Sequence, residues 1–333
     1  MLSNAIQRSW YESNFLTWLL LPISYFYRLV VWLRQTAYLI GILKTHRLSV
    51  PVIVVGNITV GGTGKTPLVI WLCEYLKKSG WSPGVVSRGY GGESTSWPQN
   101  VNQASDPRLV GDEPVLIAQR TQCPVSVGPD RVMAARRLLD EYECDIIISD
   151  DGLQHLALDR DVEILVIDGE RRFGNEHCLP AGPLREPIKR LNTVDIKVVN
   201  GGTKDNECKM TLKMSEAVNV PDETNRKVLS GFGNNSVHAV AGIGNPERFF
   251  TQLRQSGLDI VPHPFPDHHT FVEKDLVFND ELPVLMTEKD AVKCKSFASK
   301  NYWYVPVEAM MSELFESELS KQVVNLISGN IHD

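Results

Sequence analysis

A glycine-rich loop between an expected buried strand and an expected helix constrains this chain most strongly. The apolar run at residues 52–55 precedes the loop, and apolar side chains recur at helical spacing over residues 68–76 after it. Backbone amides and a helix N-terminus in such a setting form an anion site. The pattern predicts a nucleotide whose β/γ-phosphates contact Lys65 and whose Mg²⁺ contacts the Thr66 hydroxyl.

The match to the phosphate-loop pattern GxxxxGK[ST] departs from it at the first position, where Thr59 replaces glycine. The tripeptide GK[ST] alone is weak, so the prediction rests on the flanking strand and helix, and a plain turn is the alternative. The predicted nucleotide-binding residues are Thr59, Val60, Gly61, Gly62, Thr63, Gly64, Lys65 and Thr66.

An acidic pair follows a second apolar strand. Residues 146–149 are expected to form a buried strand, and Asp150 and Asp151 come directly after Ser149. A phosphate-loop enzyme needs an acid at the end of a neighbouring strand for its magnesium shell, and Asp150 is the first candidate. The alternative is a polar turn at residues 150–152.

The alternation of apolar strands and amphipathic helices predicts an α/β fold with a parallel sheet covered on both faces, as in phosphate-loop proteins. A polar stretch at residues 201–227 suggests a boundary before a second, smaller α/β unit. The expected domains are a helix within residues 1–45, a nucleotide-binding domain at 46–215 and a smaller domain at 216–333. The pair Gly242 and Gly244 is expected to form a tight turn.

The N-terminal segment predicts an amphipathic helix at a membrane surface. Nine of the 27 aromatic residues lie within residues 10–38, and apolar side chains gather on one helical face. Only fifteen uncharged residues separate Glu12 from Arg28, which is short for a membrane span. The interpretation is an interfacial helix holding the body at the inner-membrane surface; a tilted span and a core or dimer helix are alternatives.

Charge and cysteine content narrow the classes further. The net charge is −6, and residues 1–50 hold five basic residues and one acidic residue, so the remainder is acidic. Nucleic acid is therefore not an expected partner, because its binding depends on Lys and Arg meeting phosphates. Six dispersed cysteines without a paired motif fit a reducing cytosol.

The loop alone leaves several classes of phosphate-loop protein open. Membrane-recruited ATPases of the partition and septum-positioning type carry KGGxGKT, which residues 60–66 resemble. Their additional lysine corresponds to Val60 here, so that reading is the alternative rather than the preferred one. No NKxD motif indicates a GTPase.

Motifs along nearly the whole chain resemble the tetraacyldisaccharide 4′-kinases of lipid A synthesis in Gram-negative bacteria. The segments that carry the resemblance are residues 55–57, 61–67, 87–92, 111–114, 149–155, 168–169, 171–174, 179–187 and 286–293. The resemblance implies transfer of the ATP γ-phosphate to the 4′-hydroxyl of an acylated glucosamine disaccharide 1-phosphate. It also implies Mg²⁺ and a substrate at the cytoplasmic face of the inner membrane, with the enzyme peripheral or monotopic there.

The same resemblance suggests roles for further residues. It implies Asp112 as the proton acceptor, assisted by His268 across a cleft that closes between the domains. Asp151 and Glu186 join the candidate magnesium ligands, and the candidate contacts of the 1-phosphate are Arg171, Arg172 and Arg185. Lys289 and Asp290 match the family without a physical explanation from sequence.

Each of these assignments has an alternative. Asp112 stands where a helix N-cap would, before Pro114. His268 could belong to an ordinary loop, or to a zinc site with His263 and Asp267. The arginines could be solvated or ion-paired, and Glu186 could belong to a structural turn.

Overall fold

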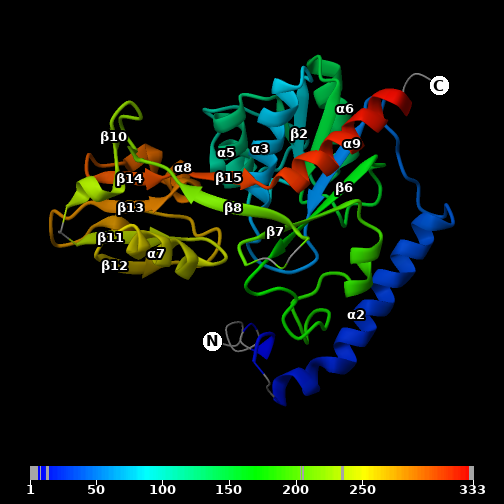
Figure 1. The fold of residues 1–333 in the computed structure, drawn as a ribbon, viewed down its shortest axis with the longest axis horizontal. Coiled ribbons are helices and arrows are strands. Elements are labelled where there is room, and N and C mark those ends of the chain that lie inside the picture. Colours follow the sequence, from blue (N-terminus) through cyan, green and yellow to red (C-terminus); the bar gives the residue numbers. More distant parts are fainter. Residues whose placement is uncertain are drawn as a thin grey trace.

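The structure, a computed structural model, describes residues 7, 9–12, 15–202, 204, 206–233 and 236–329 (Figure 1). The remaining residues of the predicted N-terminal segment, 1–6, 8 and 13–14, lie outside the described residues. Two sheets form two bodies that lie side by side, and a long helix, α2 (Phe15–Leu39), stands along one of them.

The larger sheet has nine strands, in the order β15-β8-β7-β6-β1-β5-β2-β4-β3. Its strands are β1 (Val52–Gly56), β2 (Pro83–Ser87), β3 (Gln99–Val101), β4 (Val125–Val127), β5 (Ile146–Asp150), β6 (Val162–Asp168), β7 (Ile196–Asn200), β8 (Cys208–Met214) and β15 (Val307–Met311). All neighbours from β8 to β4 pair in parallel, and β15 and β3 are antiparallel edges. The expected α/β class is confirmed.

The central strand β1 is buried on both sides because all four residues before Gly56 are apolar and mostly β-branched. Ile53 and Val55 share a core with Leu72 of α3, whereas Val54 shares a core with Leu138 of α6. The period of two along the strand therefore separates the two helical layers. The helices with this sheet are α3 (Lys65–Lys78), α4 (Pro107–Val110), α5 (Asp112–Thr121), α6 (Arg131–Glu141), η1 (Ile188–Asn192) and α9 (Glu313–Gly329).

The smaller sheet has six strands, in the order β10-β9-β14-β13-β11-β12. Its elements are β9 (Ala217–Asn219), β10 (Arg226–Lys227), η2 (Leu229–Phe232), β11 (Val237–Ala241), α7 (Pro246–Gln255), β12 (Ile260–Pro264), η3 (Glu273–Leu276), β13 (Val284–Thr287), α8 (Glu288–Cys294), η4 (Lys295–Phe297) and β14 (Tyr302–Val305). Phe249, Phe250 and Leu253 of α7 are buried against this sheet.

The chain enters the smaller body after β8 and leaves it before β15, and these two strands are paired antiparallel (Figure 1). From the sequence, residues 216–333 are expected to form the second unit as one block. The sheet order departs from this expectation at the C-terminus. β15 extends the larger sheet, and Phe315 and Leu319 of α9 are buried in its core. The apolar side chains of α9 thus pack in the core of the larger sheet. The sequence pattern of a helix shows that one face is apolar but does not specify the sheet against which that face packs.

Helix α2 turns Ser24, Tyr27 and Gln35 toward the protein and exposes many of its apolar side chains. Ser24 donates to the Cys178 carbonyl at 2.7 Å and Tyr27 to the Arg185 carbonyl at 2.8 Å. Phe15 and Phe26 are 79% and 67% exposed. By length and composition alone α2 is able to cross a membrane, so the short uncharged stretch does not exclude a span.

Candidate active site

The predicted phosphate loop follows β1 and ends at the first residue of α3. Gly61 and Gly64 have φ values of 103° and 95°, a conformation that favours glycine. A Cβ on Gly64 would also lie 2.4 Å from Asn200 Nδ2. That amide donates to the Thr63 carbonyl at 2.9 Å, so close approach and backbone conformation both require glycine at this position.

Asn57 holds the loop together, and the sequence analysis did not include it among the site residues. Its side chain is fully buried, and Nδ2 donates to the carbonyls of Thr59 at 2.8 Å and Gly61 at 3.4 Å. Lys65 Nζ donates to Asn57 Oδ1 at 3.3 Å. Asn57 thus fixes both ends of the loop, and its presence within a family motif at residues 55–57 was the available signal.

Lys65 faces the acidic pair at the end of β5. Its Nζ lies 3.6 Å from Asp151 Oδ1, and Arg185 Nη1 contacts both oxygens of the same carboxylate at 3.1 and 2.9 Å. Burial raises the pKa of Asp151, but the charges of Lys65 and Arg185 outweigh it and leave the pKa lowered. The structure therefore brings together Lys65, Asp151 and Arg185, with Arg185 ion-paired.

Asp150 is buried at the end of β5, opposite Val55 of β1. Ser87 Oγ donates to Oδ2 at 3.1 Å, whereas Oδ1 has no hydrogen-bond partner. Burial raises the pKa of Asp150 to about 7, and the nearby carboxylates of Glu113 and Asp151 add to the shift. A buried carboxylate with one free oxygen and acidic neighbours is an environment that a cation would stabilise.

These features fit a Mg²⁺ ion that binds together with a nucleotide. Mg²⁺ commonly takes one or two protein ligands and completes its shell with water and phosphate oxygens. Within the described ranges no group of three or more His, Cys, Asp or Glu residues forms a ready metal cage. Asp150, with Thr66 in the first turn of α3, matches this sparse donor set.

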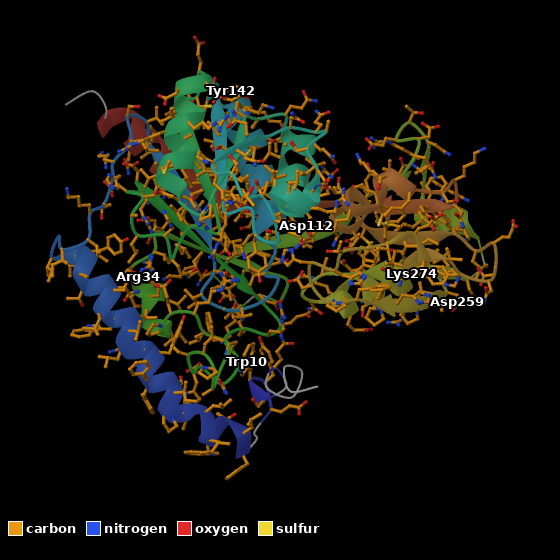
Figure 2. The ribbon with its side chains drawn as sticks, turned by 180° about the vertical axis from the view of Figure 1, so that it is seen from behind. Trp10, Arg34, Asp112, Tyr142, Asp259 and Lys274 are labelled. Carbon is orange, nitrogen blue, oxygen red and sulfur yellow. The ribbon has the colours of Figure 1, made fainter. Side chains whose placement is uncertain are left out.

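A second cluster forms where the two bodies meet, around Asp112 at the start of α5 (Figure 2). His268, from the smaller body, places Nδ1 3.3 Å from Asp112 Oδ1. Lys293 Nζ lies 3.6 Å from Oδ2, and Lys289 Nζ lies 3.9 Å from Oδ1. The structure thus brings together Asp112 and His268, which are far apart in the sequence.

The electrostatics of this pair favour an ionised Asp112. Burial raises its pKa, but the hydrogen bond with His268 and the charges of Lys289 and Lys293 outweigh burial and lower the pKa to about 2. Burial lowers the pKa of His268, but its contact with Asp112 leaves that pKa raised overall.

The structural alternatives for this cluster do not account for it fully. The N-cap of α5 is Gly111, and Asp112 Oδ1 accepts from the adjacent Glu113 amide at 2.8 Å while it also contacts His268 of the smaller body. His268 has a φ of 58°, which is uncommon for a residue other than glycine. The described residues give no support to the zinc alternative.

Lys289 and Asp290 acquire a physical explanation. Lys289 Nζ contacts Glu113 Oε1 at 3.0 Å and Asp267 Oδ1 at 3.5 Å. Its positive charge therefore offsets the negative charges of these two carboxylates. Asp290 is fully buried and accepts from the Gly242 amide at 2.8 Å and from Thr287 Oγ1 at 2.6 Å. Asp290 therefore fixes the turn after β11.

That turn lies against the phosphate loop. A Cβ on Gly244 would lie 2.7 Å from the Gly62 nitrogen, so close packing of two backbones accounts for this glycine. Arg248 of α7 donates to Asn200 Oδ1 at 2.8 Å. Sequence reasoning missed Arg248, because its partner lies on the other sheet.

The other predicted arginines are paired. Arg171 donates to the Gly62 carbonyl at 2.7 Å and to Asp168 at 3.0 Å, so it lies at the phosphate loop. Arg172 contacts both oxygens of Glu207 at 2.7 and 2.8 Å. Their contact with a substrate phosphate stays a prediction.

Glu186 is buried and accepts from Gln35 Nε2 at 2.7 Å and from Gln154 Nε2 at 2.6 Å. Arg190 Nε lies 3.5 Å from the same carboxylate. Its contacts therefore connect it with α2 and with the residues after β5. Its role as a magnesium ligand stays a prediction.

The parallel sheet, the loop and the acids after β5 define an α/β protein of the phosphate-loop class. A sequence profile of the tetraacyldisaccharide-1-P 4′-kinase family, LpxK, matches residues 16–324. The chain belongs to this family, which confirms the resemblance and does not favour the partition-type ATPase alternative.

Individual relatives agree with the profile. The chain is similar to the tetraacyldisaccharide 4′-kinase of Nitrosococcus oceani, with 55% identity over 95% of this chain and 94% of the relative. It is similar to that of Methylobacillus flagellatus, with 50% identity over 99% and 98% of the two chains. A crystal structure described as an apo form of LpxK from Aquifex aeolicus in complex with ATP superposes with a TM-score of 0.78. That protein is 28% identical, and the match covers 93% of this chain and 99% of the other.

Proposed function

We propose that this protein transfers the γ-phosphate of ATP to the 4′-hydroxyl of tetraacyldisaccharide 1-phosphate, a step of lipid A synthesis. The observation that carries the proposal is the placement of the Asp112–His268 pair next to the acids of the phosphate-loop site, within a chain of this kinase family. Glu113 joins the two clusters, because its carboxylate contacts Lys289 and raises the pKa of Asp150.

The phosphate loop, residues 59–66, binds the triphosphate through backbone amides, and Lys65 contacts the β/γ-phosphates. Thr66 and Asp150 would hold Mg²⁺, with Asp151 and Glu186 as further candidates. Bound Mg²⁺ would offset the negative charge of the phosphates during transfer. Lys65 is positioned for its role by Asn57 and Asp151.

Asp112 accepts the proton of the attacking sugar hydroxyl. Its lowered pKa keeps it ionised across the neutral range, and burial excludes competing water. His268 holds Asp112 in orientation through Nδ1 and comes from the smaller body. Closure of that body over ATP holds His268 against Asp112 near the γ-phosphate.

The acceptor reaches the site from a membrane surface. The outward face of α2, which includes Phe15, Trp18 and Phe26, supplies apolar contact with lipid. The protein then lies at the cytoplasmic face of the inner membrane and does not bind nucleic acid. Arg171, Arg172 and Arg185 contact the substrate's 1-phosphate by exchanging their present carboxylate partners for it.

The domain limits follow the sheets. We assign the nucleotide-binding domain to residues 46–215 together with β15 and α9, and the smaller domain to the segment between β8 and β15. Residues up to 45 form the membrane-associated element.

The decisive experiment incubates the purified chain with γ-labelled ATP, Mg²⁺ and the acylated disaccharide 1-phosphate in mixed micelles. Label is expected in the lipid, and Lys65→Ala is expected to abolish it. Release of label only as inorganic phosphate would contradict the kinase proposal and favour an ATPase.

Membrane attachment is tested by polar substitutions on the outward face of α2, such as Phe26→Ser with Leu33→Ser. These side chains are 67% and 52% exposed, so the fold should tolerate the change. The variant should shift from vesicles to the soluble fraction in flotation. Unchanged flotation would contradict the role of this face.

A further inference from the structure

A chain of hydrogen bonds, which includes the backbone carbonyl of Asn57, connects α2 with the phosphate loop. Gln35 of α2 donates to Glu186 Oε2 at 2.7 Å, and Gln154 donates to Glu186 Oε1 at 2.6 Å. Gln154 Nε2 also donates to the Asn57 carbonyl at 3.1 Å. Asn57 in turn accepts from Lys65, so three side chains separate the outer helix from the lysine of the loop.

The backbone follows the same route. The Arg185 amide donates to the Ile58 carbonyl at 2.7 Å, and the Val60 amide donates to the Pro183 carbonyl at 2.9 Å. Residues 183–186 therefore pair with the beginning of the phosphate loop on one side. On the other side Tyr27 of α2 binds the Arg185 carbonyl at 2.8 Å.

The Glu186 carboxylate depends on both amide donors of this connection. The side chain is 2% exposed, and an ionised carboxylate only accepts hydrogen bonds. Both oxygens are used by amide donors, and Arg190 Nε at 3.5 Å compensates the charge. Loss of one donor leaves a buried carboxylate oxygen unsatisfied, which is costlier than the net value of a hydrogen bond.

We propose that Gln35 and Gln154 are positioning residues that hold Asn57, and through it Lys65 and the phosphate loop, in the ATP-binding geometry. Seating of α2 on residues 183–186 is thereby coupled to nucleotide binding, in addition to any contact of α2 with lipid. This inference rests on the proposed kinase function, and it goes further by assigning α2 a role inside the ATP site.

The test uses the full chain with Gln35→Leu and Gln154→Leu. Leucine keeps helix propensity at position 35 and removes the amide donor. Both variants should raise the Kd for a non-hydrolysable ATP analogue by about fivefold to twentyfold, since each leaves the same buried carboxylate underpaired. The KM for ATP should rise with it, whereas the KM for the lipid and vesicle flotation should stay unchanged.

Ser24→Ala is the matched control on α2. It removes the 2.7 Å hydrogen bond from α2 to the Cys178 carbonyl, which reaches residues 183–186 through backbone pairing with Leu184 and involves neither Glu186 nor Gln154. Its analogue Kd should stay within about twofold of wild type. An equal loss in Ser24→Ala would mean that α2 acts only through general docking and would overturn the inference.

Exchanging the amide and the carboxylate between positions 35 and 186 distinguishes a positioning role of Glu186 from a role as a magnesium ligand. Gln35→Glu places two carboxylates in contact and should weaken analogue binding about tenfold or more. Adding Glu186→Gln restores a donor–acceptor pair and should recover most of the affinity, even without Mg²⁺. Failure of the double variant to recover would contradict positioning through this chain.

Two results would overturn the inference outright: a wild-type Kd in Gln35→Leu, or a rise confined to the KM for the lipid. Failure of the kinase proposal is distinguishable from either. In that case the wild-type chain binds the analogue and transfers no label to lipid, while the effect of Gln35→Leu on analogue binding persists.

Discussion

The phosphate loop and the Asp112 cluster are built in opposite ways. The hydrogen bonds that hold the loop come from the larger body: Asn57 lies eight positions from Lys65, and Asn200 and Arg171 bond carbonyls of the loop. The cluster joins groups from two bodies, such as Glu113 and Lys289, which are 176 positions apart. Nucleotide binding should therefore survive changes in how the bodies meet, whereas transfer should not.

Lys65→Ala is expected to have the largest effect, because it damages the local site on which both functions depend. Loss of the charge next to the phosphates should lower kcat/KM by about 10³-fold or more and weaken ATP binding. Calorimetric titration with an ATP analogue measures binding, and lipid labelling measures transfer. The control is Lys78→Ala at the far end of α3. Near-normal transfer in Lys65→Ala would contradict a role of the loop in the reaction.

Asp112→Asn should separate the two regions. Asparagine keeps the size of the side chain but cannot accept the hydroxyl proton, so kcat should fall about 10²- to 10⁴-fold. Because the hydrogen bonds that hold the loop do not include Asp112, the Kd for ATP should change less than about threefold. Parallel loss of nucleotide binding would instead indicate that Asp112 has only a structural role in α5.

The adjacent histidines offer a matched pair. His268→Gln removes the 3.3 Å partner of Asp112 and should lower kcat by about 10- to 100-fold, with little change in KM for ATP. His269 contacts Asp275 at 2.9 Å outside the cluster, and His269→Gln should stay within about twofold of wild type. Steady-state kinetics decide the comparison, and equal effects would place His268 in an ordinary loop.

The smallest predicted effect is a pH dependence of magnesium affinity at the loop. The pKa of Asp150 is raised to about 7, so its metal-binding carboxylate form is present above pH 7 and is lost as the pH falls. With ATP saturating, the apparent Mg²⁺ affinity should fall about tenfold per pH unit below 7. Asp150→Asn should abolish this slope, and the same slope in that variant would assign it to another group.

The strands that position the site could be predicted because their sequences are distinctive. Residues 52–55 and 146–148 are continuous apolar runs, which are typical of a parallel strand covered on both faces. The C-terminal β15 was not predicted as part of the larger sheet, since only Ala309 among its five residues is buried. A weak alternation does not specify which of two sheets it joins.

The site residues also divide into those that the sequence predicts and those that it does not. Lys65, Thr66 and Asp150 are predicted from the loop motif and from the strands and helix around it, whereas Asp112 and His268 require the family resemblance. Asn57, Gln154 and Arg248 were missed, because amides and single arginines carry no chemical signature in sequence. Their importance arises from partners that only folding brings close: Gln154 and Asn57 are 97 positions apart, and Arg248 and Asn200 are 48 apart.

The central claim is that one transfer joins the ATP of the loop to a sugar hydroxyl facing Asp112. Its most direct test is a phosphorus–proton correlation spectrum of the lipid product made by the purified protein. The account predicts a new phosphomonoester coupled to the proton at carbon 4′, next to the retained 1-phosphate. A phosphate on any other carbon, or an unmodified lipid despite consumption of ATP, would contradict it.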